Sequence, residues 1–218
     1  MKKQKVYFFS GLGADQRVFA KIKLPDAFET VHVQWITVAK KEALQDYCLR
    51  LSEQIDTSVP FSFVGLSFGG VVAVELAKKI KPQKLIIISS VSRYKELPGV
   101  YKMVACLKLN KIFSGKIMKA MSPLIATVFD PETKETKTIL KQIFKDTSPQ
   151  FLKWSIDNLL GWKNEEHPDN LIHIHGTADR ILPFVNVKAD FKIENGGHLM
   201  IYDRAEEINA ILQKILIV

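Results

Sequence analysis

Cysteine is scarce in this sequence, with two among 218 residues. Cys48 and Cys106 both fall in helical patterns, and their spacing is typical neither of a disulfide framework nor of a metal site. We therefore expect two buried or half-buried thiols in a reducing, cytoplasmic environment. No pattern of ligating residues predicts a metal ion.

Long hydrophobic runs are also lacking. No stretch approaches the roughly 18 apolar residues that a membrane-spanning helix needs. The apolar run at residues 6–9 is too short for the core of a signal peptide. These absences predict a protein without stable membrane insertion.

Acidic residues are few relative to basic ones, 23 against 31, which gives a net charge of +8. The excess is concentrated at residues 95–119, where six lysines face one acid, Glu96. No nucleic-acid-binding motif and no ladder of basic and aromatic residues accompanies them. We expect a solvent-exposed, lysine-bearing helical face and no nucleic-acid partner. The alternative is a face that attracts an anionic substrate or a membrane surface.

Phosphate-binding glycine motifs are incomplete. Gly11-Leu12-Gly13 lacks the third glycine of a dinucleotide fingerprint, and no Gly-Lys-Ser/Thr follows any glycine turn. The sequence therefore predicts no organic cofactor.

What the chain does contain is an alternation of strand and helix patterns, which is typical of a parallel α/β sheet. We expect a three-layer α/β/α sandwich around a mostly parallel six-stranded sheet. The predicted strands are residues 5–9, 31–36, 61–66, 84–90, 171–175 and 191–194, and the clearest predicted helices are 68–80 and 205–216.

The alternation stops at residues 94–166, where only helical patterns occur. Asp130-Pro131 and Ser148-Pro149 each offer an N-cap followed by proline at the first helical position. This stretch is too long for a loop. We interpret it as a helical lid inserted into a core made of residues 1–93 and 167–218.

The segment Gly65-Leu66-Ser67-Phe68-Gly69-Gly70 lies between a predicted strand and a predicted helix. A serine in so tight a turn projects above the carboxyl edge of the sheet, and the residues two before and two after it must be small. Gly65 and Gly69 meet that need. The turn is typical of a nucleophile elbow, and the N–H of Phe68 at the helix start is a candidate oxyanion donor.

A nucleophilic serine needs a base and a group that orients the base. Asp179 and His198 follow the fifth and sixth predicted strands, at the edge where open α/β sheets place their sites. His175 is an alternative base, and Glu96, shortly after the fourth strand, is an alternative acid.

These residues resemble the α/β-hydrolase fold superfamily, in its branch of small lid-bearing serine esterases and lipases. The resemblance covers residues 4–92 and 169–217. It implies Ser67 as nucleophile, His198 as base and Asp179 as the acid that orients it. It also implies a second oxyanion donor after the first strand. There this chain has Ser10-Gly11-Leu12 instead of the usual His-Gly pair, and the N–H of Leu12 is expected to serve. The motifs that carry the resemblance are the glycine–serine turn, His175-Gly176-x-x-Asp179-x-x-x-Pro183 and Gly196-Gly197-His198.

The predicted function is cleavage of a medium-sized, largely apolar carboxylic ester through an acyl-enzyme, by a monomer or homodimer. Thioesterase, C–C bond hydrolase and acyltransferase activities use the same triad and stay open, as does a non-catalytic ligand-binding protein on this fold. Most methionine and aromatic side chains of the lid are expected to form its own core, and some to line the substrate cavity. Its lysines Lys102, Lys108 and Lys111 are expected to favour an anionic end.

Overall fold

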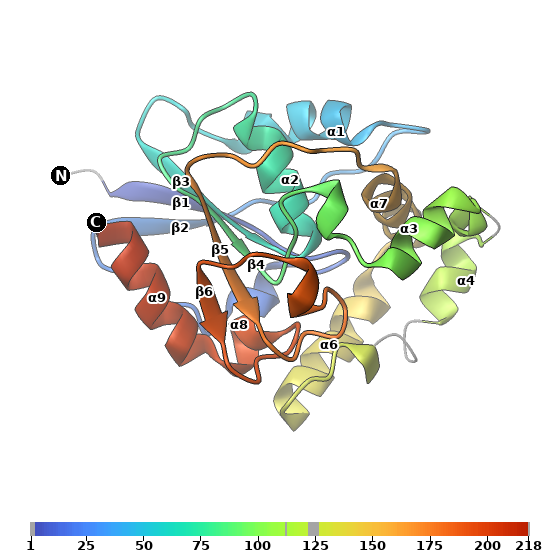
Figure 1. Cartoon of the computed structure of the whole chain (residues 1–218). Helices are drawn as coiled ribbons and strands as arrows, with labels where there is room; N and C mark the ends of the chain where they lie inside the picture. Colours follow the sequence, from blue (N-terminus) through green and yellow to red (C-terminus); the bar gives the residue numbers. More distant parts are fainter. Residues whose placement is uncertain (1–2, 112, 122–126, 218) are drawn as a thin grey trace.

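The computed structural model describes residues 3–111, 113–121 and 127–217, and its centre is a six-stranded sheet in the order β2-β1-β3-β4-β5-β6 (Figure 1). Every neighbouring pair in this sheet is parallel. The prediction of an α/β sandwich on a six-stranded sheet is thereby confirmed. The strands are β1 (Gln4–Phe9), β2 (Phe28–His32), β3 (Phe61–Leu66), β4 (Leu85–Ile88), β5 (Leu171–Gly176) and β6 (Phe191–Ile193).

Helices cover both faces of the sheet, which explains why β3 and β4 are buried at every position instead of alternating. Tyr7 and Phe9 of β1 pack on the side of α1 (Leu44–Leu51) and α2 (Phe68–Ala77). Val6 and Phe8 pack on the opposite side, against α8 (Met200–Asp203) and α9 (Ala205–Ile217). The two cores lie on either side of the sheet and hold its carboxyl edge rigid.

Helices follow β4 before the chain returns to the sheet at β5. Those with described bounds are α3 (Gly99–Cys106), α4 (Gly115–Ala120), α6 (Lys134–Asp146) and α7 (Pro149–Gly161). In Figure 1 they gather beyond one end of the sheet, away from α9. Helix α7 starts as predicted, with Ser148 accepting a hydrogen bond from the N–H of Phe151 and proline at the first position.

The predicted strand at 31–36 is wrong in its bounds, because β2 runs from Phe28 to His32. Its register pairs Gln4 of β1 with Phe28, so pairing begins earlier than the hydrophobic pattern indicates. The N–H of Val33 still donates a hydrogen bond to the carbonyl of Phe8, but β1 ends at the next residue. The N–H groups of Gln34 and Ile36 instead donate to the side-chain oxygens of Gln54 and Tyr47.

Two other local predictions are wrong. Asp130 does not cap α6. Its φ of 48° places it in a turn, and Thr133 is the N-cap that accepts from the N–H of Thr136. Cys48 is buried as expected, whereas Cys106 is exposed near the end of α3, because the short helix packs on its neighbours through other positions.

None of the helices in the described ranges is both long and apolar enough to cross a membrane.

Candidate active site

Ser67 occupies the single residue between β3 and α2, with φ 53° and ψ −122°. This is a left-handed region that residues with a Cβ rarely adopt, and it is found mostly where the surrounding structure enforces it. The Ser67 carbonyl is held in place by the N–H of Gly70 at 2.9 Å and by the hydroxyl of Ser90 at 2.6 Å. The turn therefore fixes the direction of the serine side chain.

The glycines around Ser67 are required by close backbone approach. A Cβ on Gly65 would lie 2.5 Å from the Cα of Gly70, and one on Gly69 would lie 2.2 Å from the carbonyl oxygen of Phe9. Strand and helix thus meet without room for a methyl group, as the sequence pattern predicts. Gly70 is equally constrained, since its Cβ would lie 2.3 Å from Ser90 Oγ.

Ser67, His198 and Asp179 form one hydrogen-bonded chain. Ser67 Oγ lies 2.9 Å from His198 Nε2, and His198 Nδ1 lies 2.8 Å from Asp179 Oδ2. A carboxylate only accepts, so Nδ1 carries the proton, and the lone pair of Nε2 faces the serine hydroxyl. The structure therefore brings together the three residues that the sequence singled out, from the ends of β3, β5 and β6.

Asp179 is buried and yet ionised. Burial alone would raise the pKa of its carboxyl group. The neighbouring His198 and the N–H of Leu182 outweigh that effect and hold the pKa below its usual value. The second carboxylate oxygen accepts from the N–H groups of Ile181 and Leu182, each at 2.9 Å. These bonds fix the carboxylate, which in turn fixes the imidazole ring.

The loop after β1 presents its backbone to Ser67. A Cβ on Gly11 would lie 3.5 Å from the Cβ of Ser67. Within the described residues, the N–H groups of Leu12 and Phe68 donate no hydrogen bond. Ser10 Oγ donates to the carbonyl of Ala14 at 2.7 Å. The Ser10 side chain thus stabilises the conformation of this loop.

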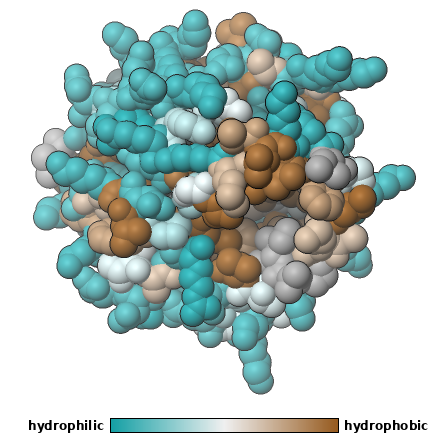
Figure 2. Space-filling view, turned by 45° about the vertical axis from the view of Figure 1, so that its right-hand side comes forward, coloured by the Kyte–Doolittle hydropathy of each residue, from teal (hydrophilic) through white to brown (hydrophobic). Residues whose placement is uncertain are grey.

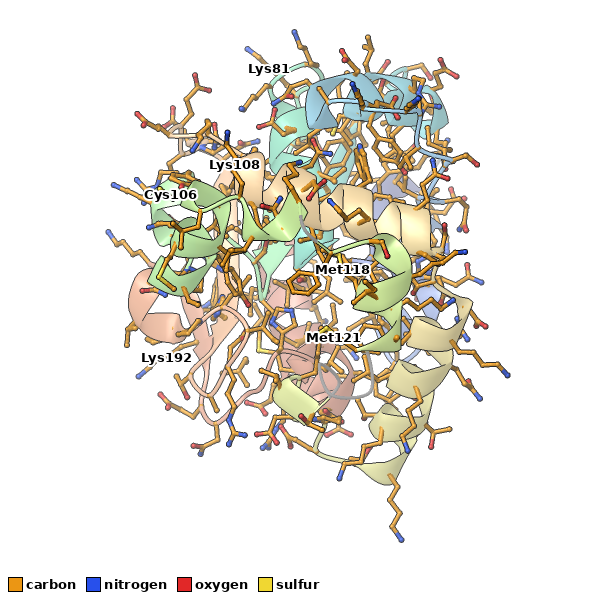
Figure 3. All side chains as sticks on the ribbon, turned by 90° about the vertical axis from the view of Figure 1, so that its right-hand side faces the viewer. Lys81, Cys106, Lys108, Met118, Met121 and Lys192 are labelled. Carbon is orange, nitrogen blue, oxygen red and sulfur yellow. The ribbon has the colours of Figure 1, made fainter. Side chains whose placement is uncertain are left out.

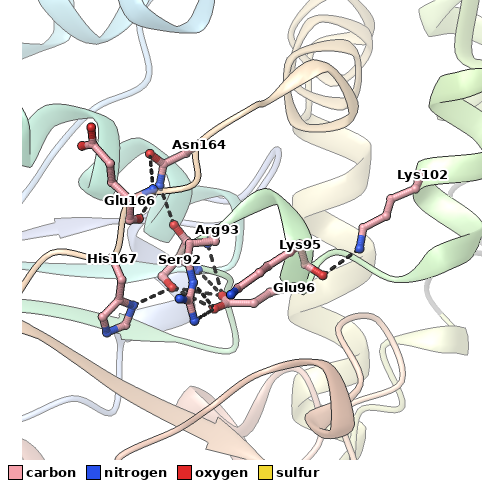
Figure 4. A network of polar contacts seen from close by, with 8 residues as sticks. All are labelled: Ser92, Arg93, Lys95, Glu96, Lys102, Asn164, Glu166 and His167. Carbon is pink, nitrogen blue, oxygen red and sulfur yellow. Dashed lines mark hydrogen bonds and ion pairs between the residues drawn. The ribbon is translucent and has the colours of Figure 1, made fainter.

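Glu96, the alternative acid, belongs to a separate polar network (Figure 4). It is buried and accepts hydrogen bonds from Ser92 and from the guanidinium of Arg93. Ser92 also bonds His167 Nδ1 at 2.9 Å. None of these bonds reaches His198, so the acid beside His198 is Asp179.

His175, the alternative base, lies behind Asp179 and not beside Ser67. Its Nε2 is 2.8 Å from the carbonyl of Leu182 and 3.4 Å from Asp179 Oδ2. His173 Nε2 lies 2.9 Å from His175 Nδ1, so the two rings form a buried pair. Burial lowers the pKa of both rings, which keeps this pair neutral.

A small apolar cavity of about 40 Å³ opens onto Ser67 and His198. Phe129 packs edge-on to the His198 ring, with centroids 5.2 Å apart. Sequence reasoning did not single out Phe129 for this contact, because nothing local marks a residue so distant along the chain. The apolar walls of the cavity include Val18, Phe129, Leu140, Ile143, Phe144 and Leu199.

Some side chains of the helical segment at residues 94–166 line this cavity and others do not. Of its aromatic and methionine side chains, Phe129 and Phe144 line the cavity. Phe151, Trp154 and Trp162 belong to the core against α1 and α2. Lys102, Lys108 and Lys111 do not line this cavity, and Lys111 pairs with Asp157 at 2.9 Å. Met118 is buried, whereas Met103, Phe113 and Met121 are exposed.

No protein-family model and no curated protein sequence matches the chain. Many solved structures do match. One is an esterase from Exiguobacterium antarcticum, with a TM-score of 0.73 at 17% identity over 97% of this chain and 91% of that one. MenH from S. aureus has a TM-score of 0.71 at 16% identity, covering 99% and 94% of the two chains. An epoxide hydrolase from Bacillus megaterium has 0.69 at 14%, again covering 99% and 94%. Proteins of different activity thus share this architecture.

Proposed function

Because the chain has the α/β-hydrolase fold, as these structures do, we propose that it is a serine hydrolase that cleaves a carboxylic ester through an acyl-enzyme. The observation that carries the proposal is the unbroken chain of hydrogen bonds from Ser67 through His198 to Asp179. A serine in a strained strand-to-helix turn, with a base and an orienting carboxylate in reach, is the arrangement that nucleophilic catalysis requires.

The reaction proceeds in two acyl-transfer steps. His198 Nε2 takes the hydroxyl proton as Ser67 Oγ attacks the ester carbonyl, and the oxyanion accepts hydrogen bonds from the N–H groups of Leu12 and Phe68. The imidazolium, stabilised by Asp179, then gives its proton to the leaving alcohol. Water attacks the acyl-enzyme by the same route, which restores Ser67 and releases the acid.

The walls of the cavity favour an apolar acyl or aryl group, since among the described residues that line it only Ser67 and His198 have polar side chains. A volume of about 40 Å³ holds about three groups the size of water. A medium-sized acyl group is larger, so part of the cavity wall moves to admit it. We place the movable part in residues 94–166, as a lid on a core of residues 1–93 and 167–218.

A fluorophosphonate probe tests the proposal, because it reacts only with an activated serine. We expect the folded protein to be labelled at Ser67, as located by peptide mass, and Ser67→Ala to remain unlabelled. The polar Ser90, whose hydroxyl bonds the backbone, should stay unmodified as an internal control. Folded protein without any labelled serine would favour a binding protein on this fold.

Graded series of esters and thioesters would then separate the activities that share this triad. Faster turnover of thioesters than of matched esters would assign a thioesterase. Rate enhancement by an added alcohol acceptor would assign an acyltransferase. Ester cleavage that depends on acyl length would support the assignment made here.

A further inference from the structure

Helices α3 and α4 carry an exposed row of large apolar side chains that the proposed chemistry does not use. On α3 they recur at positions i, i+3 and i+7, which places them on one helix face. On the following segment they recur at i, i+4 and i+8. Their exposed fractions lie between 44% and 60%. We call this surface the α3–α4 face: Val100, Met103, Leu107, Phe113, Ile117 and Met121.

The two helices present this face together. Both pack against α7, and in Figure 3 they lie toward the viewer in front of it. In Figure 2, which brings the same side of the molecule forward, hydrophobic residues gather among hydrophilic ones. Large apolar side chains exposed together on one side of a folded chain indicate a site of interaction.

The segment that carries the α3–α4 face has charged residues of one sign. Residues 97–129 contain five lysines and no acidic residue. Lys111 is neutralised by Asp157. Within the described residues, Lys102, Lys108, Lys116 and Lys119 have no acidic partner, although Lys102 and Lys119 donate to backbone carbonyls.

The combination of exposed apolar side chains and lysines distinguishes between the partners that could bind the α3–α4 face. A second copy of the chain, docked face to face, would oppose two surfaces on which lysines outnumber acids, and such surfaces repel. An anionic phospholipid surface offers both what the lysines attract and what the apolar side chains need. We propose that the α3–α4 face binds peripherally to anionic membrane surfaces, without any spanning helix.

The chain next to the cavity also exposes an apolar side chain, since Val128 is exposed and the next residue, Phe129, packs edge-on to the His198 ring. The proposed binding itself does not depend on any reaction at Ser67.

Co-sedimentation of the whole protein with sucrose-loaded vesicles tests the proposal. We expect sedimentation with vesicles of phosphatidylcholine and phosphatidylserine, and little with phosphatidylcholine alone. The double variant K108E/K116E should bind at least about tenfold more weakly, since each lysine near the surface contributes attraction. M103S/L107S should also weaken binding, because it removes apolar contact from exposed positions.

The matched control is K79E/K81E. It makes the same change of charge at two exposed lysines that follow α2 and lie outside the α3–α4 face. It should bind as the wild type does. Equal loss in this control would show attraction by overall charge and overturn the proposal, as would no sedimentation with anionic vesicles. A dimer in sedimentation velocity that M103S/L107S dissociates would assign the face to a second copy instead. Repeating the experiment with Ser67→Ala separates membrane binding from hydrolysis.

Discussion

Ser67 adopts a conformation that costs about 1–3 kcal/mol for a residue with a side chain. Two hydrogen bonds to its carbonyl and the steric limits at Gly65 and Gly69 hold it there. Rigid neighbours compensate for this strain and hold the hydroxyl oxygen 2.9 Å from His198 Nε2. At the residue scale, the geometry of the site therefore depends on a backbone that fixes the direction of the Ser67 side chain.

Replacing Asp179 by asparagine should lower turnover by roughly 10⁴-fold, because the amide leaves His198 in the wrong tautomer. Ester hydrolysis by the purified variant measures this, with circular dichroism as the check on folding. Glu96→Gln is the matched control, since Glu96 bonds Ser92 and Arg93 and not His198. Retained activity in Asp179→Asn together with its loss in Glu96→Gln would reverse the two roles.

At the scale of elements, the meeting of β3, α2 and β1 depends on glycine. Gly69→Ala should destabilise the protein by at least about 2 kcal/mol, because the new Cβ would lie 2.2 Å and 2.3 Å from the carbonyl oxygens of Phe9 and Ser10. Gly161→Ala is the matched control. It ends α7 with nothing within 4 Å of the new Cβ, and we expect a gain of up to about 1 kcal/mol.

Urea denaturation of both variants gives the comparison, through the free energy of unfolding. Equal stability in the two alanine variants would show that β1 and α2 can separate without cost, contrary to the structure.

Elements with strong local patterns could be predicted from the sequence. The all-apolar β4, the amphipathic α9 and the turn at Ser67 each follow from residue type and spacing. The bounds of β2 could not, because they depend on where β1 ends and which side chains then take over its hydrogen bonds. The start of α6 was predicted wrongly because Asp130-Pro131 resembles an N-cap followed by proline. Asp130 lies in a turn, and the N-cap of α6 is Thr133.

The candidate site likewise contains residues that could be predicted from the sequence and contacts that could not. Ser67, Asp179 and His198 are marked by glycines and strand ends nearby in the sequence. The contact of Phe129 with His198 and the hydrogen bond between Ser92 and His167 instead join segments that are distant along the chain. A single sequence contains no local signal for such contacts.

For the whole molecule, buried histidines make stability depend on pH. Burial lowers the pKa of His32, His173 and His175, that of His173 to about 3. The unfolded chain therefore binds more protons between the folded and unfolded pKa values. The stabilisation is present above the unfolded value of 6.5 and is lost as the pH falls toward the folded value.

We expect the free energy of unfolding to decrease from pH 6.5 to pH 5 by up to about 1.4 kcal/mol per pH unit for His173. His32 and His175 add losses of the same sign. Urea denaturation at several pH values measures the slope, and His173→Asn should reduce it. Asp179, whose pKa is also lowered, adds a loss of the same sign only at lower pH, below about 4. A constant free energy between pH 5 and 6.5 would contradict this account.

The order of the strands also determines when the candidate site can exist. Ser67 and His198 are 131 positions apart. His198 follows β6, which is an edge strand and the last strand of the sheet in chain order. A nascent chain that has folded only β1 to β4 has a strained serine without a base. The hydrogen bond between them forms only after β5 and β6 have paired. During synthesis or refolding, this bond is therefore a marker of molecules whose sheet is finished.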